Sequence, residues 1–301
     1  MTGGVPLQWR PRDPVSRLGG RARHAAGELR ARLGARSPAR HPSRPDFLGI
    51  GGQKCGTTWL DRMLRRHPSV AMADCKEMHY FDRALHRAPA AYFRHFPSDR
   101  EVKRGEITPA YALLSTRRIA YVHRLLPDLR LVLLLRDPVE RAWSQIRMNL
   151  ADVPGRPLAS LSLEEVTRAV DSPAVRRRSD YPGTIERWTA FFARDRLLIG
   201  YHRQIAEEPW ALLERVFRHI GVAVPSDRRA FATDRRVLPV ARRGGEADDA
   251  EPPGSVPERF RPLLEERLGD VRRRTVELLG DEATRWLGPA TDDEGEFHAG
   301  A

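Results

Sequence analysis

A chain of 301 residues with a formal net charge of +12 is long enough to bury one substantial core. The charge is unevenly spread: residues 1–45 carry ten arginines against two acidic residues, a net +8, which leaves +4 for all the rest. The basicity belongs to a tail more than to a groove, and no DNA-binding motif accompanies it, so no nucleic-acid partner is expected. No run approaches the roughly 20 apolar residues that span a bilayer.

The two cysteines, Cys55 and Cys75, are too few for a disulfide framework or for a zinc site of their own. The first residues lack the apolar core of a signal peptide, so we expect a cytoplasmic, metal-free protein. Arginine supplies almost all of the 52 basic side chains, and only Lys54, Lys76 and Lys103 are lysines. A lysine is therefore more informative in this sequence than another arginine.

Residues 1–45 are rich in Arg, Gly, Pro and Ala, which predicts a disordered or weakly helical leader. Small and apolar residues recur within it at helical spacing: Leu18, Ala22, Ala25, Ala26, Leu29 and Leu33. A basic amphipathic helix of this kind can touch anionic lipid, so weak membrane-surface contact through residues 15–35 is one expectation. A solvated leader is the other.

Strands and helices alternate from residue 45 onward. Apolar runs predict strands at 47–51, 70–73, 131–135 and 197–201, and helices at 57–66, 139–148, 206–220 and 257–279, with another through 185–192. This order predicts an α/β fold of three layers, P-loop-like, with a central mainly parallel sheet flanked by helices. We expect one domain over residues 46–290 and a flexible tail at 291–301. Ligands of such folds bind beyond the carboxyl ends of the strands.

Residues 51–59 (GGQKCGTTW) join the first strand to a helix. A P-loop for nucleoside triphosphates reads GxxxxGK[ST], with its lysine at the start of the helix. Here Gly51 and Gly56 keep the spacing, but Thr57 takes the lysine position and Lys54 lies inside the loop. A glycine-rich turn before a helix offers backbone N–H groups to an anion. A lysine within the loop would approach the first phosphate, which suits a short 5′ phospho-group.

A second candidate anion site follows the strand at 131–135. Arg136 ends that strand, and Ser144 comes eight residues later, within the next predicted helix. A guanidinium fork with a nearby hydroxyl suits a terminal phosphate. Taken alone, Arg-Asp-Pro is more often a surface turn, so this pattern gains weight only beside the first loop.

The two loops together resemble the 5′-phosphosulfate and 3′-phosphate loops of sulfotransferases that use 3′-phosphoadenosine 5′-phosphosulfate (PAPS). Residues 76–82 (KEMHYFD) and 105–111 (GEITPAY) are similar to the K-E-x-H-[FY]-F-D and G-E-K-T-P-A-Y segments of the heparan sulfate sulfotransferase branch. A further match, to Y-x6-W-x3-F, comprises Tyr181, Trp188 and Phe192. The resemblance covers about residues 45–222, and its motifs occur in the family's order.

This resemblance implies PAPS as donor and a set of roles. Lys54 would stabilise the leaving phosphate oxygen, Glu77 would act as general base, and His79 would lie beside it. The implied donor-binding residues are Gly52, Gln53, Lys54, Cys55, Gly56, Thr57, Thr58, Trp59, Arg136 and Ser144, and those of the substrate cleft are Lys76, Asp82, Thr108 and Tyr111. No metal is implied.

The chain also departs from the family pattern. Ile107 stands where G-E-K-T-P has its lysine, which disfavours a highly anionic polysaccharide acceptor, and Ser179 replaces a glycine. The family's loop over the nucleotide has no clear counterpart, and residues Arg242, Arg243 and Gly244 are the candidate for it.

Two other readings stay open on residues alone: a P-loop kinase or other NTP-dependent phosphotransferase, and a non-enzymatic Arg-rich binding protein. Thr57 in the lysine position opposes the first, and the second describes the tail without describing the domain. The acceptor of a sulfotransferase could be a glycan, a glycolipid or a small molecule.

Overall fold

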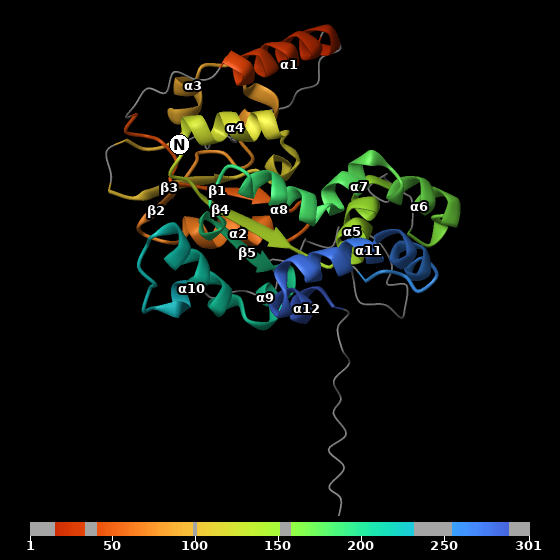
Figure 1. Ribbon diagram of the computed structural model, residues 1–301. Helices are drawn as coiled ribbons and strands as arrows, with labels where there is room; N and C mark the ends of the chain where they lie inside the picture. Colours follow the sequence, from red (N-terminus) through yellow and green to blue (C-terminus); the bar gives the residue numbers. More distant parts are fainter. Residues whose placement is uncertain (1–15, 34–40, 99–100, 151–157, 232–254, 289–301) are drawn as a thin grey trace, which may run out of the picture.

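The computed structural model describes residues 16–33, 41–98, 101–150, 158–231 and 255–288 (Figure 1). Within them five parallel strands form one sheet, in the order β2-β3-β1-β4-β5. The strands are β1 (Phe47–Gly51), β2 (Val70–Met72), β3 (Lys103–Ile107), β4 (Arg130–Leu135) and β5 (Leu197–Tyr201). Helices lie on both faces of this sheet, so the predicted three-layer fold is confirmed.

Continuous apolar runs explain the central strands. Leu131, Leu133 and Leu135 of β4 belong to the apolar cluster on one face of the sheet. Val132 and Leu134 point the other way, into the second cluster. Because side chains alternate along a strand, a parallel strand covered on both faces must be apolar at every position.

The helices form three groups around the sheet (Figure 1). The first cluster packs α1 (Ser16–Leu33), α3 (Pro89–Phe93), α4 (Thr116–Leu125), α8 (Tyr181–Thr189), α12 (Asp281–Leu287) and the short turns η1 (Tyr80–Ala84) and η2 (Pro109–Leu113). The second packs α2 (Thr57–Arg65), α9 (His202–Glu207), α10 (Pro209–Ile220) and η5 (Arg228–Phe231). A third cluster, beyond the carboxyl end of β4, joins α5 (Pro138–Leu150), α6 (Leu163–Val170), α7 (Pro173–Ser179) and α11 (Arg261–Leu279). The remaining turns are η3 (Leu158–Ser160) and η4 (Arg194–Arg196).

Strand β3 was not predicted, although it lies between β1 and β2. Its sequence, Lys-Arg-Gly-Glu-Ile, holds one large apolar residue and so gives no strand signal. Gly105 fits because a Cβ there would lie 2.3 Å from the ring of Phe47 on β1. The single helix expected at 206–220 is also corrected: α9 ends before Glu208, and Pro209 starts α10.

Helix α1 lies against α4 and η1 (Figure 1). Gly27 and Ala31 are its buried contacts. The described members of the predicted apolar stripe, Ala22, Ala25, Ala26 and Leu29, are instead exposed, Leu29 at 55%. The helix therefore packs on the domain through a face of small residues, and the stripe faces away from it.

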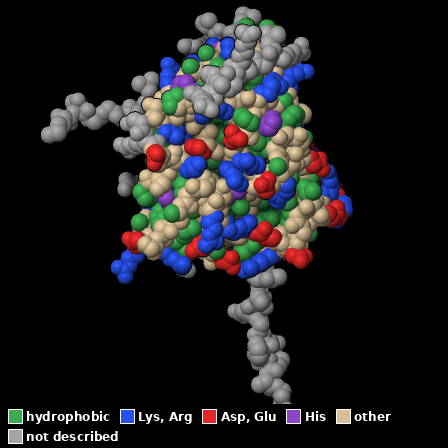
Figure 2. Space-filling view, turned by 60° about the vertical axis from the view of Figure 1, so that its left-hand side comes forward, with side chains coloured by type: hydrophobic (Ala, Val, Ile, Leu, Met, Phe, Trp, Pro, Cys, Tyr) green, Lys and Arg blue, Asp and Glu red, His purple; other side chains and the backbone are tan. Residues whose placement is uncertain are grey.

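Charged side chains of both signs are interspersed over the face of the molecule seen in Figure 2. That face carries no broad stripe of one sign. None of the described helices combines the length and the apolar character needed to cross a membrane. The tail predicted at 291–301 lies outside the described residues.

Candidate active site

The first phosphate loop leaves the end of β1 and enters α2. The Gly52 N–H donates to the Leu134 carbonyl over 2.7 Å, which ties the loop to β4. Gly56 starts α2 with φ of +90°, and a Cβ there would lie 2.2 Å from Ile205 Cδ1, so only glycine fits. Gly56 offers no side-chain cap to α2. The N–H groups of the first helical turn are therefore available to an anion.

Two of the three lysines lie in this loop or bond to it. Lys54 has φ of +68°, and its Nζ lies 3.8 Å from Met148 Sδ on α5. Lys76 Nζ donates to Thr58 Oγ1 over 2.8 Å and to Glu77 Oε1 over 3.2 Å. Lys76, expected in the substrate cleft, thus joins the donor loop to the segment that follows.

The segment at residues 76–82 brings the expected acid–base residues together. His79 Nδ1 is 2.8 Å from Asp82 Oδ2, and His79 Nε2 is 3.6 Å from Glu77 Oε2. Burial opposes a charged imidazole, but the two carboxylates outweigh it and raise the pKa of His79 to about 9. The bond from His79, with help from Lys76, lowers the pKa of Glu77. Glu77 is therefore ionised at neutral pH, as a proton acceptor must be.

The backbone of this segment is unusual. Glu77 has φ of +59° and His79 has φ of +50°, so two residues in three occupy the left-handed region without being glycine. This conformation is costly for such residues and persists only where surrounding contacts impose it. Two buried clusters supply those contacts.

The first cluster surrounds Glu106 of β3, which is 1% exposed. Its carboxylate accepts bonds from Thr108 Oγ1 (2.6 Å), Tyr111 OH (2.7 Å) and Tyr92 OH (2.9 Å). Burial raises the pKa of Glu106 despite these three donors. Thr108 Oγ1 accepts from the His79 N–H (3.4 Å), and Tyr111 OH accepts from the N–H of Tyr80 (3.1 Å).

Thr108 and Tyr111 were expected to line the substrate cleft. The structure instead leaves both fully buried, because their hydroxyls turn inward to Glu106. They hold the main chain of residues 79 and 80 through these hydroxyls.

The second cluster centres on Arg118 of α4, which is 6% exposed. Its Nη1 donates to the carbonyls of Phe81 (2.7 Å) and Asp82 (2.6 Å), and its Nε donates to Glu28 Oε1 of α1 (2.6 Å). Despite burial, Arg118 lowers the pKa of Glu28. Helix α1, which lies outside the recognised motifs, thus supplies the carboxylate that pairs with Arg118, and Arg118 in turn holds the Asp82 carbonyl. Sequence analysis gave no signal for this pair.

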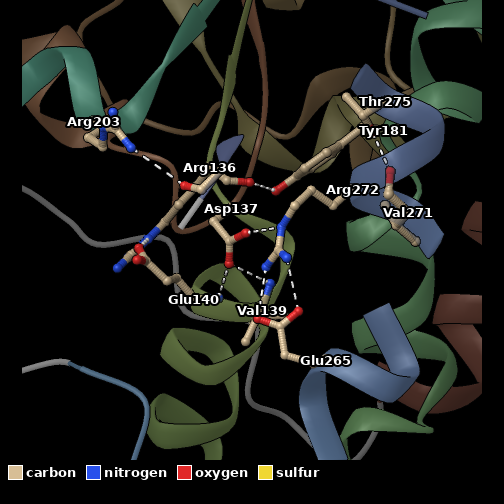
Figure 3. Close-up of polar contacts among 11 residues, drawn as sticks. Arg136, Asp137, Val139, Glu140, Tyr181, Arg203, Glu265, Val271, Arg272 and Thr275 are labelled. Atoms are coloured by element: carbon tan, nitrogen blue, oxygen red, sulfur yellow. Dashed lines mark hydrogen bonds and ion pairs between the residues drawn. The ribbon is translucent and has the colours of Figure 1, made fainter. Parts of the chain in front are cut away.

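The second phosphate loop lies at the end of β4 (Figure 3). Arg136 is 17% exposed, and its Nε donates to Glu140 Oε2 over 3.0 Å. Ser144 lies half-buried on α5. Asp137 Oδ1 accepts from the N–H groups of Val139 and Glu140, each at 3.0 Å, and so caps α5.

Tyr181, at the start of α8, joins the two loops. Its hydroxyl donates to the Arg136 carbonyl over 2.8 Å and lies 3.9 Å from Cys55 Sγ of the first loop. His202 follows β5 at the same edge of the sheet, where a Cβ on Gly56 would lie 3.4 Å from its ring. Burial, with Arg136 nearby, lowers the pKa of His202 to about 3, so its ring is neutral. His202 was missed because a lone histidine after a strand carries no motif.

Two departures from the family pattern now have physical explanations. Ser179 Oγ accepts a 2.8 Å hydrogen bond from the fully buried Arg141 of α5, so its hydroxyl satisfies a donor of that buried guanidinium. Ile107 is 1% exposed and covers Gly49 on β1, where a Cβ would lie 2.6 Å from it. The side chain at position 107 packs in the core, and the chain places no cation at the position of the family's lysine.

The other expected donor residues fall in different places. Cys55 and Trp59 are buried in the second apolar cluster, where burial raises the pKa of the Cys55 thiol to about 11. Gln53 is half-buried, and its Oε1 has no hydrogen-bond partner among the described residues. Arg242, Arg243 and Gly244 lie outside the described residues.

Comparison with known proteins gives the family. A sulfotransferase domain model matches residues 44–233. Human heparan sulfate glucosamine 3-O-sulfotransferase 6 is 27% identical over 255 residues, which is 79% of this chain and 72% of the relative. The mouse bifunctional heparan sulfate N-deacetylase/N-sulfotransferase 4 is 28% identical over 59% of this chain and 22% of its own length. The second of these relatives is thus much longer than the part that this chain matches.

Solved structures show the same fold. A sulfotransferase from Alicyclobacillus acidocaldarius superposes with a TM-score of 0.59 at 23% identity, over 81% of this chain and 98% of that chain. Mouse sulfotransferase SULT7A1, solved with PAP, gives 0.54 at 11% identity, over 88% and 92%. The domain match covers more than half of the chain and includes the loop at residues 51–59, the turn at Arg136 and the segment at residues 76–82. The chain belongs to the sulfotransferase family, as its motifs predicted.

Proposed function

We propose that this protein transfers the sulfuryl group of PAPS to a hydroxyl or amine of a glycan-type acceptor. The observation that carries the proposal is the pairing of two anion loops at neighbouring strand ends. One loop contains Lys54, the other begins with Arg136, and the Tyr181 hydroxyl contacts both. Family membership supports sulfuryl transfer as the reaction class.

The donor side follows from the charges of the two loops. The first-turn N–H groups of α2 and the Thr58 hydroxyl would hold the 5′ phosphate, and Lys54 would lie at its bridging oxygen. Arg136 and Ser144 would hold the 3′ phosphate. Thr57, buried at 6% exposure, occupies the position that a triphosphate-binding lysine would need.

Transfer would be an in-line displacement. The acceptor oxygen or nitrogen bonds to sulfur while the sulfur–oxygen bond to the 5′ phosphate breaks, and adenosine 3′,5′-bisphosphate leaves. Lys54 offsets the negative charge that grows on the leaving oxygen, and such preorganised donors contribute a few kcal/mol each. Glu77 takes the proton of the acceptor. His79, charged between the carboxylates of Glu77 and Asp82, orients the Glu77 side chain.

A glycan acceptor is supported by the relatives, whose names specify heparan sulfate. Glycans are therefore the first acceptors to examine. Ile107 brings no cation to the position of the family's lysine, which disfavours the most highly anionic of them.

Calorimetric titration with adenosine 3′,5′-bisphosphate tests the donor assignment, with ADP and with ATP plus magnesium as controls. Tight binding of the bisphosphate without metal is the expected result. Binding of ATP only in the presence of magnesium would contradict the proposal and indicate a divergent kinase.

A further inference from the structure

Arg272 of α11 makes contacts that the donor site described above does not use (Figure 3). Its Nε donates to Asp137 Oδ2 over 2.6 Å, and its two other nitrogens donate to the Glu265 carboxylate over 2.9 and 3.0 Å. The side chain is 19% exposed, and all three of its nitrogens are bonded. A planar guanidinium held at both ends has little freedom to move.

These contacts reach Arg136 through one carboxylate. Asp137 follows Arg136 in the chain, and while one of its oxygens binds Arg272, the other caps α5 through the N–H of Glu140. The Tyr181 hydroxyl donates to the Arg136 carbonyl, and the guanidinium of Arg136 pairs with the partly exposed Glu140. The turn is thus fixed on one side by α8 and on the other by α11.

Charge gives a second reason for the contact. Asp137 is 8% exposed and stands next to the arginine that would bind a phosphate. An uncompensated carboxylate there would repel a dianion, because Coulomb forces are weakly screened in a partly buried site. Arg272 compensates that charge, so Asp137 does not cancel the positive charge that Arg136 presents to a phosphate.

We propose that Arg272 is a positioning residue for the 3′-phosphate side of the donor site, acting through Asp137 on the turn that carries Arg136. The proposal rests on the proposed function. It assigns a role to α11, a helix beyond the segment at 44–233 that the family model matches. Arg272 itself would not touch the donor.

Two ligands separate positioning from general stability. Adenosine 3′,5′-bisphosphate and adenosine 5′-monophosphate share the adenosine and the 5′ phosphate, and only the first carries a 3′ phosphate. For R272M we expect the bisphosphate to bind roughly tenfold more weakly and the monophosphate to change by less than about twofold. A loss of stability alone would weaken both ligands together.

The neighbouring arginine is a matched control. Arg273 lies on the same helix at 63% exposure and pairs with Asp270 and Glu277 at the surface. R273M should leave the affinities for both ligands unchanged. If R272M does not fold, R272K serves instead: it keeps the charge but not the fork, and its selective loss should be smaller.

The outcomes are distinct. A wild-type protein that does not prefer the bisphosphate would overturn the proposed function and the positioning role with it. A wild-type preference that persists in R272M, or an equal loss for both ligands, would overturn the positioning role alone. A selective loss in R272M that R273M does not share is the result expected.

Discussion

The loop at residues 52–56 and the segment at residues 76–82 are held in place by different kinds of contact. The loop is tied by backbone bonds between regular elements, such as the one from Gly52 to Leu134. The segment has left-handed residues at Glu77 and His79 and depends on buried side chains from distant parts of the chain. A donor site can thus be built from local geometry, whereas the acid–base segment requires tertiary support.

Loss of the general base gives the largest expected effect and separates the two regions by chemistry. E77Q should lower turnover by about 10²–10⁴-fold, because an amide cannot take the acceptor proton that we assign to the Glu77 carboxylate. The readout is transfer of radioactive sulfur from PAPS to desulfated heparan oligosaccharides. K54A should also lose activity, while K103A, at an exposed lysine paired with Asp46, is the control. Wild-type turnover in E77Q and K54A would refute both roles.

The support beneath the segment can be broken at Glu106. E106Q should lower the free energy of unfolding by about 1–3 kcal/mol, because an amide nitrogen would face hydroxyls that need an acceptor. Y92F, which removes one bond and creates no mismatch, should cost less. Urea denaturation measures both, and an E106Q variant as stable as wild type would show that the cluster does not hold the segment.

Helix α1 supports the segment at residues 76–82 through Glu28 and Arg118, and this support can be tested at Gly27. A Cβ on Gly27 would lie 3.4 Å from Leu85 and 3.6 Å from Arg118, so G27L should push α1 away and separate Glu28 from Arg118. The expected cost is about 1–3 kcal/mol in thermal unfolding. G20L, at a glycine with open space around it, is the matched control on the same helix. Equal stability of the two variants would contradict a supporting role for α1.

The charge on His79 predicts a pH dependence. The folded-state pKa of His79 is raised to about 9, above the ordinary value of 6.5. Its contribution to stability is therefore complete below about pH 6.5 and is lost as pH rises through 9. The stability difference between wild type and H79Q should shrink over that interval in urea denaturation series. A difference that grew with pH would reverse the assignment of charge.

The smallest expected effect lies on the donor side. Glu140 is 46% exposed and pairs with Arg136, so it competes with a phosphate for that guanidinium. E140Q should bind adenosine 3′,5′-bisphosphate about two- to fivefold more tightly, which is modest because solvent screens the pair. Weaker binding would mean that Glu140 orients Arg136 more than it blocks it.

Features built from local geometry could be predicted from the sequence, and features that depend on tertiary contacts could not. β1, β4 and the loop after β1 could be predicted because apolar runs, glycines and a lysine lie next to one another in the chain. β3 could not, since only Ile107 among its residues is large and apolar. Its burial depends on Phe47 packing over Gly105, and its Glu106 is accommodated by tyrosines from other elements.

The contacts of Glu28 with Arg118 and of Asp137 with Arg272 escaped prediction for another reason. The two residues of these pairs are 90 and 135 positions apart in the chain, respectively. The arginine of each pair is one among many in an arginine-rich chain. Only the fold shows which of these arginines are buried against a carboxylate.

Titration of E77Q and R136M with adenosine 3′,5′-bisphosphate tests most directly whether the donor site is separate from the acid–base segment. We predict that E77Q binds the bisphosphate as wild type does, because Glu77 belongs to the acid–base segment, and that R136M loses most of that affinity. Wild-type affinity in R136M would contradict the two-loop donor site, and a large loss in E77Q would contradict its separation from the acid–base segment.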